Sequence, residues 1–244
     1  MPCDQTIFSQ LEFDIRCEWG EQGVAALAPN CDAVIIVDVL SFSTCVDVAT
    51  ARGALVHPYL WKDEAAASFA RSIGAELAQA KRSSVTYSLS PQSLLHIPPR
   101  TQLVLPSPNG ATLTLRAERA LTVTGCLRNC RAVALAVQKI GRRIGIIPAG
   151  ERWQDQSLRP AWEDWIGAGA IIRHLPGTLS LEARSALTAF SEAQEEIFAY
   201  LKQCGSGKEL IARGFEEDVV LAAAMNVSNA VPVYKNGVYV RLNT

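Results

Sequence analysis

The stretch Ala-Val-Ile-Ile-Val-Asp-Val-Leu-Ser-Phe-Ser-Thr at residues 33–44 decides the fold. Its apolar, mostly β-branched residues predict a buried parallel strand, and the run is interrupted by Asp38. A hydroxyl-rich turn follows, and residues 45–52 are typical of a helix that ends before Gly53, at its C-terminal cap position. Asp38 therefore lies where a central strand passes into a helix, and open α/β sheets bind ligands at that edge.

The hydroxyl groups of this turn suggest an anion site. Ser41, Ser43 and Thr44 lie at or near the start of the expected helix, where free backbone N–H groups and the helix dipole favour an anion. The same loop then offers a carboxylate for a cation and a pocket for a phosphate-like group. The alternative, which this loop leaves open, is that Asp38 or the serines only cap the helix.

Composition narrows the class of protein. The 244 residues, 49% apolar and 19% charged, are enough for a single α/β domain over residues 1–244, although two interlocked subdomains would also fit. The net charge is −1 with scattered Lys and Arg, so we expect neither a nucleic-acid nor a membrane partner. Residues 1–16 lack the apolar core of a signal peptide, which indicates a cytoplasmic location. A homo-oligomer is left open.

Cysteine usage agrees with that location. The seven cysteines are dispersed, and Cys126 and Cys130, the one close pair, do not have the C-x-x-C spacing of a redox or zinc site. We expect free thiols that behave mostly as small buried hydrophobes.

Strand and helix patterns alternate along the chain. This alternation predicts an α/β fold, layered α/β/α, with a largely parallel or mixed sheet. Asn236-Gly237 between residues 231–234 and 238–242 predicts a C-terminal β-hairpin. Residues 75–99 are irregular and polar, and loops of that length are usually functional or mobile. The other strands are expected at residues 7–16, 53–60, 102–105, 121–124 and 143–147, and the helices at 18–27, 45–52, 62–73, 111–117, 129–140, 160–172, 181–203 and 209–224.

Four of the inner strands end in unusual turns, at residues 38–44, 107–110, 125–129 and 148–151. A parallel sheet would bring these ends to one edge, so we expect them to converge on one crevice. Asn109 and Gly110 can expose backbone N–H groups to an anion, or they form an ordinary turn. Asn129 either hydrogen-bonds a substrate or caps its helix.

A second acidic stretch, Trp-Glu-Asp-Trp-Ile-Gly-Ala-Gly-Ala at residues 162–170, places Glu163 and Asp164 in the first turn of a helix. They could simply complement the helix dipole. Alternatively, one carboxylate takes a metal while the other orients a water, and Gly167 and Gly169 let the helix pack closely on the sheet. Asp38 with Glu163 or Asp164 suits Mg²⁺, and the absence of a His/Cys cluster argues against zinc.

These motifs together resemble the 2-phosphosulfolactate phosphatase family. The resemblance covers nearly the whole chain, in order, and its matching pieces are Val37 to Leu40, Asn109-Gly110, Asn129 with Ala132 to Ala134, Ala149-Gly150, Glu163-Asp164 with Ala168-Gly169, and Val231 to Val233. It implies an Mg²⁺-dependent acid phosphatase tied to coenzyme M biosynthesis. We therefore expect hydrolysis of a small anionic phosphoester, 2-phosphosulfolactate or a related compound. Asp38, Glu163 and Asp164 would be the catalytic and metal residues, and Ser41, Ser43, Thr44, Asn109, Gly110 and Asn129 would bind substrate.

The chain departs from the family pattern at two positions, and it matches the family's Gly/Asp-containing segment poorly around Tyr87. Ser41 replaces an arginine that would be a natural fork for an anion, and Ala111 follows Asn-Gly where the family has threonine. We expect the missing arginine to weaken activity on 2-phosphosulfolactate unless another cation compensates, and Arg128 is the nearest candidate by sequence. A noncatalytic anion-binding homologue is the alternative function. Whether water or Asp38 is the nucleophile stays open.

Overall fold

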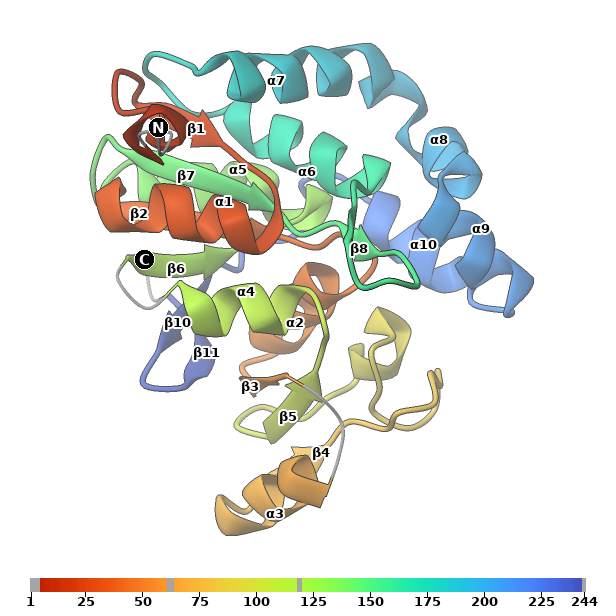
Figure 1. Cartoon of the computed structure of the whole chain (residues 1–244). Coiled ribbons are helices and arrows are strands. Elements are labelled where there is room, and N and C mark those ends of the chain that lie inside the picture. The colour runs from red at the N-terminus through yellow and green to blue at the C-terminus, as the bar shows by residue number, and fades with distance from the viewer. Residues whose placement is uncertain (1–4, 61–63, 118–119, 243–244) are drawn as a thin grey trace.

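The predicted central strand is confirmed as β2 (Ala33–Val37) in the computed structural model, which describes residues 5–60, 64–117 and 120–242. All five of its residues are buried because helices cover both faces of the sheet (Figure 1). Ala33, Ile35 and Val37 belong to the hydrophobic core on one face, while Val34 and Ile36 belong to the core on the other.

β2 lies within a nine-stranded sheet of order β1-β7-β2-β6-β10-β11-β3-β5-β4. The first four strands are mutually parallel, and so are the last three. The α/β class and the largely parallel, mixed sheet are therefore as predicted. The strands other than β2 are β1 (Ile15–Cys17), β3 (Leu55–Tyr59), β4 (Glu76–Leu77), β5 (Gln102–Pro106), β6 (Leu121–Thr124), β7 (Ile144–Pro148), β10 (Pro232–Lys235) and β11 (Val238–Arg241).

The C-terminal hairpin is confirmed, and it lies in the middle of the sheet. β10 pairs antiparallel with β6, and β11 pairs antiparallel with β3, so strand direction reverses between the two parallel halves. The turns after β2, β6 and β7 thus share one edge, as expected. The turn after β5 does not share it through parallel alignment, because β5 runs in the opposite sense. This turn nevertheless reaches Asp38, because the backbone N–H of Gly110 donates to its carboxylate. β5 lies five strands away from β2 in the sheet, and over five strands the sheet twist adds up to roughly 100°.

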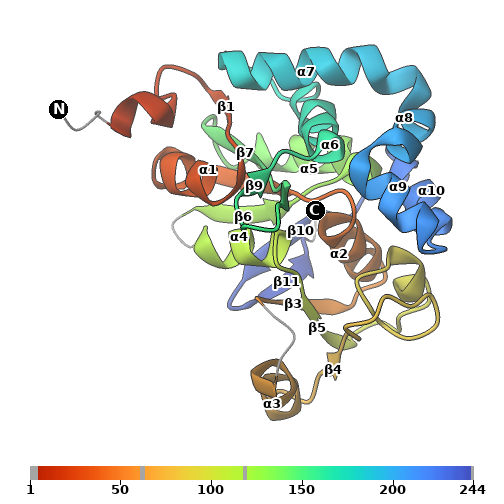
Figure 2. The ribbon, with the colours of Figure 1, turned by 45° about the vertical axis from the view of Figure 1, so that its right-hand side comes forward.

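Helices form a layer on each face of the parallel half that contains β2. Helices α1 (Gly20–Leu27) and α4 (Gly110–Arg116) pack on one face, and α5 (Cys130–Val137) and α6 (Trp162–Ile172) pack on the other, with α7 (Leu181–Ala193) outside α6. α2 (Phe42–Ala51) packs against β3, β10 and β11. Figures 1 and 2 show α8 (Ile197–Gln203), α9 (Gly205–Ala212) and α10 (Glu216–Ala223) grouped together at one side of the sheet.

Several predicted boundaries are wrong. Residues 7–16 form a strand only at β1, since η1 (Gln5–Ser9) precedes it and the apolar Ile7 and Phe8 are exposed. The expected helix 181–203 is divided into α7 and α8 by η5 (Gln194–Glu196). The helix expected over 62–73 is α3 (Glu64–Ser72), and residues 62 and 63 lie outside the described ranges. The segment 75–99 is mostly irregular, as expected, with β4 and η3 (Pro91–Leu94) inside it. The remaining short elements are η2 (Ala28–Asn30), η4 (Leu127–Asn129) and the two-stranded ribbon of β8 (Glu151–Arg152) and β9 (Leu158–Arg159).

The cysteines and the helix lengths can be compared with what the composition predicted. The six cysteines that the structure describes are all buried and unpaired, as predicted, and Cys3 lies outside the described residues. In the described part of the chain, no helix has the length and apolar character needed to cross a membrane.

Candidate active site at the sheet edge

Asp38 is held rigidly at the carboxyl end of β2. The backbone N–H of Phe42 donates to its Oδ1 (3.1 Å) and that of Gly110 donates to its Oδ2 (2.9 Å). A β-carbon on Gly110 would lie 2.7 Å from Cγ of Phe42 and 2.9 Å from Oδ2 of Asp38, so only glycine lets this turn approach the two side chains this closely. The predicted convergence of the Asp38 loop with the Asn109-Gly110 turn is therefore present in the structure.

Asp164 joins α6 to two strand ends. Its Oδ1 accepts the backbone N–H of Val39 (2.7 Å), and its Oδ2 accepts that of Gly150 (2.9 Å). A β-carbon on Gly167 would lie 2.6 Å from Val39, so this glycine packs α6 on the β2 end, as predicted. Gly169 packs instead against Ala186 of α7. Because Asp164 uses both oxygens on backbone groups, it fixes the positions of the two loops.

Glu151 and Glu163 complete a cluster of four acidic side chains. Glu151 follows β7, and its Oε2 accepts a hydrogen bond from Nδ2 of Asn109 (2.9 Å). Glu163, in the first turn of α6, is 2% exposed and interacts with the thiol of Cys204. We call Asp38, Glu151, Glu163 and Asp164 the acidic cluster. Within the described ranges, none of the four forms an ion pair with a basic side chain.

Burial and nearby negative charge make three carboxyl groups of the acidic cluster, those of Asp38, Glu151 and Asp164, hard to ionise. Burial, together with the smaller effect of the Glu163 charge, raises the pKa of Asp38 to about 6, against the lowering effect of its two N–H bonds. Burial and the charge of Asp38 raise the pKa of Glu151 to about 7. Burial, with the charges of Asp38 and Glu163, raises the pKa of Asp164 well above its ordinary value. A cation at this place would relieve the repulsion.

A cavity of about 120 Å³ lies against the cluster and has room for only a small molecule. Asp38 and Glu151 line it together with Ser41, Asn109 and Ser107, so the loops after β2, β5 and β7 all reach it. A larger cavity of about 270 Å³ lies on the side of Asn109 and Glu151 toward α1. Of the acidic cluster it contacts Glu151 alone. The chemistry is therefore concentrated at the smaller cavity.

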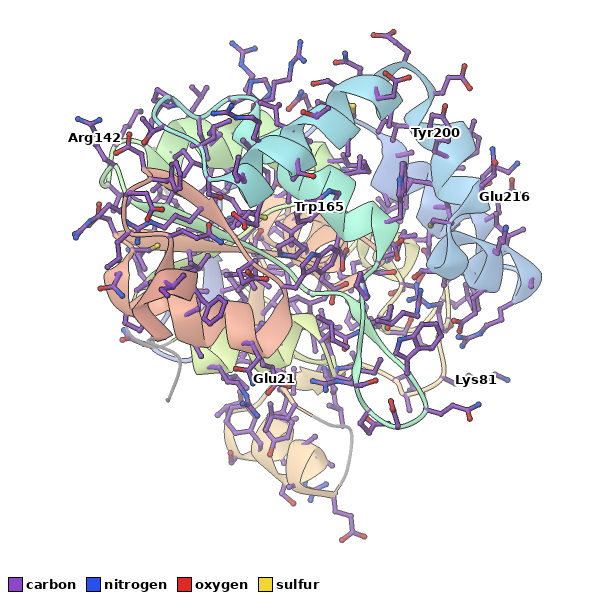
Figure 3. The ribbon with its side chains drawn as sticks, turned by 45° about the horizontal axis from the view of Figure 1, so that its top comes forward. Glu21, Lys81, Arg142, Trp165, Tyr200 and Glu216 are labelled. Atoms are coloured by element: carbon purple, nitrogen blue, oxygen red, sulfur yellow. The ribbon has the colours of Figure 1, made fainter. Side chains whose placement is uncertain are left out.

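A basic side chain that the sequence analysis did not single out enters the small cavity. Arg82 comes from the irregular segment 75–99, its side chain is 10% exposed, and its Nη2 donates to Oγ of Ser41 (3.1 Å). Its Nη1 forms an ion pair with the buried Asp218 (2.7 Å), which fixes the guanidinium. The neighbouring Lys81 is exposed and extends outward in Figure 3. The length and polarity of this loop were the signal for a functional segment.

Arg128 does not take the place of the missing arginine. Its Nε forms an ion pair with the buried Asp47 (2.9 Å), and its Nη1 donates to the carbonyl of Leu221, so the guanidinium is used inside the fold. The cation beside Ser41 is Arg82. Sequence proximity to Asn129 suggested Arg128, but the long loop delivers a more distant residue.

Three of the predicted substrate-binding residues lie beneath the cavity, outside its lining. Ser43 is fully buried, donates to the carbonyl of Ile36 and accepts the backbone N–H of Asp38 (2.9 Å). Thr44 donates to the carbonyl of Val39 (2.7 Å). Asn129 accepts the backbone N–H of Cys126 (2.9 Å) in a capping box at η4, and its side chain forms no capping bond to α5, the helix that it was predicted to cap. These side chains hold the loops in place, whereas Ser41 and Asn109 reach the cavity and Gly110 contacts Asp38.

The acidic side chains fit Mg²⁺, which keeps several of its waters, better than they fit a metal ion coordinated only by protein ligands. Across residues 5–60, 64–117 and 120–242, no three His, Cys, Asp or Glu side chains are arranged to hold a metal ion directly. Mg²⁺ keeps several waters and is usually bound by one or two carboxylates together with substrate phosphate. The buried carboxylate oxygens of the acidic cluster, without basic partners, match that requirement.

The fold and the cavity define an α/β protein whose sheet edge places buried carboxylates beside Arg82 and Ser41. Comparison with known proteins gives the family. The model of the 2-phosphosulpholactate phosphatase family matches residues 23–237, so the chain belongs to this family. The 2-phosphosulfolactate phosphatase of Methanothermobacter thermautotrophicus is 30% identical over 135 residues, which are 55% of this chain and 57% of that protein. A protein of Carboxydothermus hydrogenoformans named probable 2-phosphosulfolactate phosphatase is 29% identical over 214 residues, 82% of this chain and 85% of that protein.

Proposed function

We propose that the protein is an Mg²⁺-dependent phosphatase that hydrolyses 2-phosphosulfolactate. The observation that carries the proposal is the acidic cluster, whose carboxylates lack basic partners beside a small cavity that also receives Arg82. Family membership and the names of the relatives support the same substrate. This substrate is small enough for a cavity of about 120 Å³, and its negative charge suits Arg82.

Each part of the cluster has a role in this proposal. Asp38 and Glu163 hold Mg²⁺, directly or through water, and Asp164 positions the loops that present them. When bound, the ion neutralises phosphate charge and lowers the pKa of a water molecule. Arg82, Ser41 and the Asn109 turn bind and orient the substrate anion. Orientation of this kind lowers the barrier because substrate and nucleophile no longer have to find each other.

Glu151 is suited to protonate the leaving group. It lines the cavity, its pKa is about 7, and Asn109 fixes one of its oxygens. A carboxyl that keeps its proton near neutral pH can donate it to the ester oxygen as the bond to phosphorus breaks. The products are then inorganic phosphate and the free alcohol.

The role of Glu151 predicts an effect that depends on the leaving group. Glu151→Gln should lower kcat on 2-phosphosulfolactate by about 100-fold or more, since general acids contribute about 10²–10⁴. It should lower kcat much less on p-nitrophenyl phosphate, whose leaving group needs no proton. Glu182→Gln, on the exposed face of α7, is the matched control. Equal losses on both substrates would exclude the proton-donor role.

The proposed function itself is tested by phosphate release from 2-phosphosulfolactate by the purified protein, with Mg²⁺ and with EDTA. We expect turnover only with the metal. Binding of 2-phosphosulfolactate without any phosphate release under either condition would instead favour the noncatalytic anion-binding homologue.

A further inference from the structure

Ser206, a residue on the wall of the small cavity, has a buried hydroxyl without a partner among the described residues. Ser206 is 5% exposed, and its Oγ has no hydrogen-bond partner among the described residues. Ser206 also lines the 120 Å³ cavity with Asp38 and Arg82. Buried hydroxyls are normally hydrogen-bonded because leaving one unpaired costs stability. An unpaired hydroxyl at a cavity wall is what a ligand-binding group looks like before its ligand arrives.

Ser206 sits in the first turn of α9, which adds further donors. Sγ of Cys204 accepts the backbone N–H of Gly207 (3.3 Å), and the carbonyl of Cys204 accepts that of Lys208 (3.0 Å). The amides of Gly205 and Ser206 come before these bonds, where a helix has no internal acceptor for them. The positive end of the helix dipole lies at the same place and favours an anion.

Two arginines lie near this helix end, and the carboxylate of Glu163 interacts with Cys204 at its cap. Arg82 lines the same cavity, and a β-carbon on Gly205 would lie 3.1 Å from Nη1 of Arg159, so a second guanidinium lies against the first turn. Arg213 and Glu209 also line the cavity, but they pair with each other (2.9 Å) and contribute no net charge. The cavity therefore has carboxylates at Asp38 and Glu151, and it has hydrogen-bond donors at Ser206 and Arg82.

We propose that Ser206, the first-turn amides of α9 and Arg82 form a subsite for the sulfonate group of the substrate. This inference rests on the proposed function for the position of the phosphate, which lies beside the carboxylates of Asp38 and Glu151. A sulfonate has three oxygens, so the hydroxyl, an amide and a guanidinium can each donate to it. Ser206 then distinguishes a phosphoester with a sulfonate from one without.

Two phosphoesters that differ in the sulfonate group test this subsite. 2-Phosphosulfolactate and 2-phosphoglycerate share a phosphoester and a carboxylate, and only the former has a sulfonate. Ser206→Ala should raise KM for 2-phosphosulfolactate by about tenfold or more, because a hydrogen bond to a charged group is lost. KM for 2-phosphoglycerate should stay within about twofold of wild type. Unchanged KM for both, or an equal rise for both, would overturn the proposal.

Stability separates this role from a structural one. Because the Ser206 hydroxyl has no partner in the described part of the chain, Ser206→Ala should leave Tm unchanged or raise it. Ser180→Ala is the matched control, since Ser180 caps α7 by accepting the backbone N–H of Ala183 (3.1 Å). That variant should lower Tm and leave both KM values unchanged. A lower Tm in Ser206→Ala, with no selective change in KM, would mean that the hydroxyl is structural.

Equilibrium binding distinguishes failure of the subsite from failure of the proposed function. 3-Sulfolactate and glycerate carry no phosphate and differ in the sulfonate, and their binding can be measured by calorimetry on wild type and Ser206→Ala. We expect wild type to bind 3-sulfolactate more tightly than glycerate, and the variant to lose that preference. If wild type hydrolyses neither phosphoester but keeps this preference, the subsite stands and the proposed function fails. No preference in wild type would refute the subsite.

Discussion

Gly110→Ala tests whether close approach at Gly110 holds Asp38 in place. A β-carbon there would lie 2.7 Å from Cγ of Phe42 and 2.9 Å from Oδ2 of Asp38. Phe42 is fully buried and packs edge-on against Tyr239, so the ring cannot swing into solvent. Overpacking of a core costs about 1–3 kcal/mol, and weakening the N–H bond to a charged acceptor costs about 1.5–3 kcal/mol. The gain in helix propensity from alanine returns up to about 1 kcal/mol.

The net loss is about 2–5 kcal/mol, which corresponds to a fall in Tm on the order of 10 °C for a chain of this size. Activity should fall as well, because displacement of the Asp38 loop disturbs the site. Thermal unfolding and phosphate release from one preparation provide both measurements. Gly145→Ala is the control for overpacking alone. Its β-carbon would lie 3.1 Å from Sγ of Cys31, at a place outside the site, so this variant should keep wild-type KM. A Gly110→Ala protein with wild-type Tm and activity would refute this account of the loop.

Two further predictions follow from burial. The pKa of Glu151 rises from 4.5 to about 7 on folding, so the folded state binds more protons and the free energy of unfolding should fall as pH rises through that interval. The raised pKa of Asp38 acts in the same direction. Tm measured in EDTA should therefore be lower at pH 8 than at pH 5, and Mg²⁺ should recover part of the loss at pH 8. A higher Tm at pH 8 than at pH 5 in EDTA would contradict the electrostatic argument. The six described cysteines are buried and free, so they should resist a thiol reagent in the native protein, and all seven thiols should react after unfolding without reductant. A count below seven would indicate a disulfide.

Local patterns predicted the elements whose physics is local. All five residues of β2 are buried, as the run of apolar residues predicts for a strand inside a parallel sheet, whatever its position in the strand order. Asn236 and Gly237 both have positive φ, as the hairpin turn requires. The insertion of that hairpin between β6 and β3 could not be predicted, because pairs such as Val233 with Val123 depend on residues far away in the chain.

The residues of the candidate site also divide into those that local sequence patterns predicted and those that depend on distant parts of the chain. Asp38 follows the strongly patterned strand β2, and Glu163 and Asp164 lie in the first turn of the strongly patterned helix α6, so their proximity follows from the order of strands and helices. Arg82 lies in a loop without periodicity, and its position depends on the ion pair with Asp218, 136 residues away. Ser206 gave no signal because residues 205–208 were not predicted to begin a helix.

The central claim is that Asp38 supports a magnesium-dependent hydrolysis at this sheet edge. The most direct test is the rate of phosphate release from 2-phosphosulfolactate as a function of Mg²⁺ concentration, for wild type and Asp38→Asn, with the exposed Asp155→Asn as control. We expect saturable activation by Mg²⁺ in wild type and in the control. Asp38→Asn should keep its fold by circular dichroism and lose at least about 100-fold in rate, since metal stabilisation contributes several kcal/mol. Wild-type release by Asp38→Asn, or release by wild type that is unaffected by EDTA, would contradict the claim.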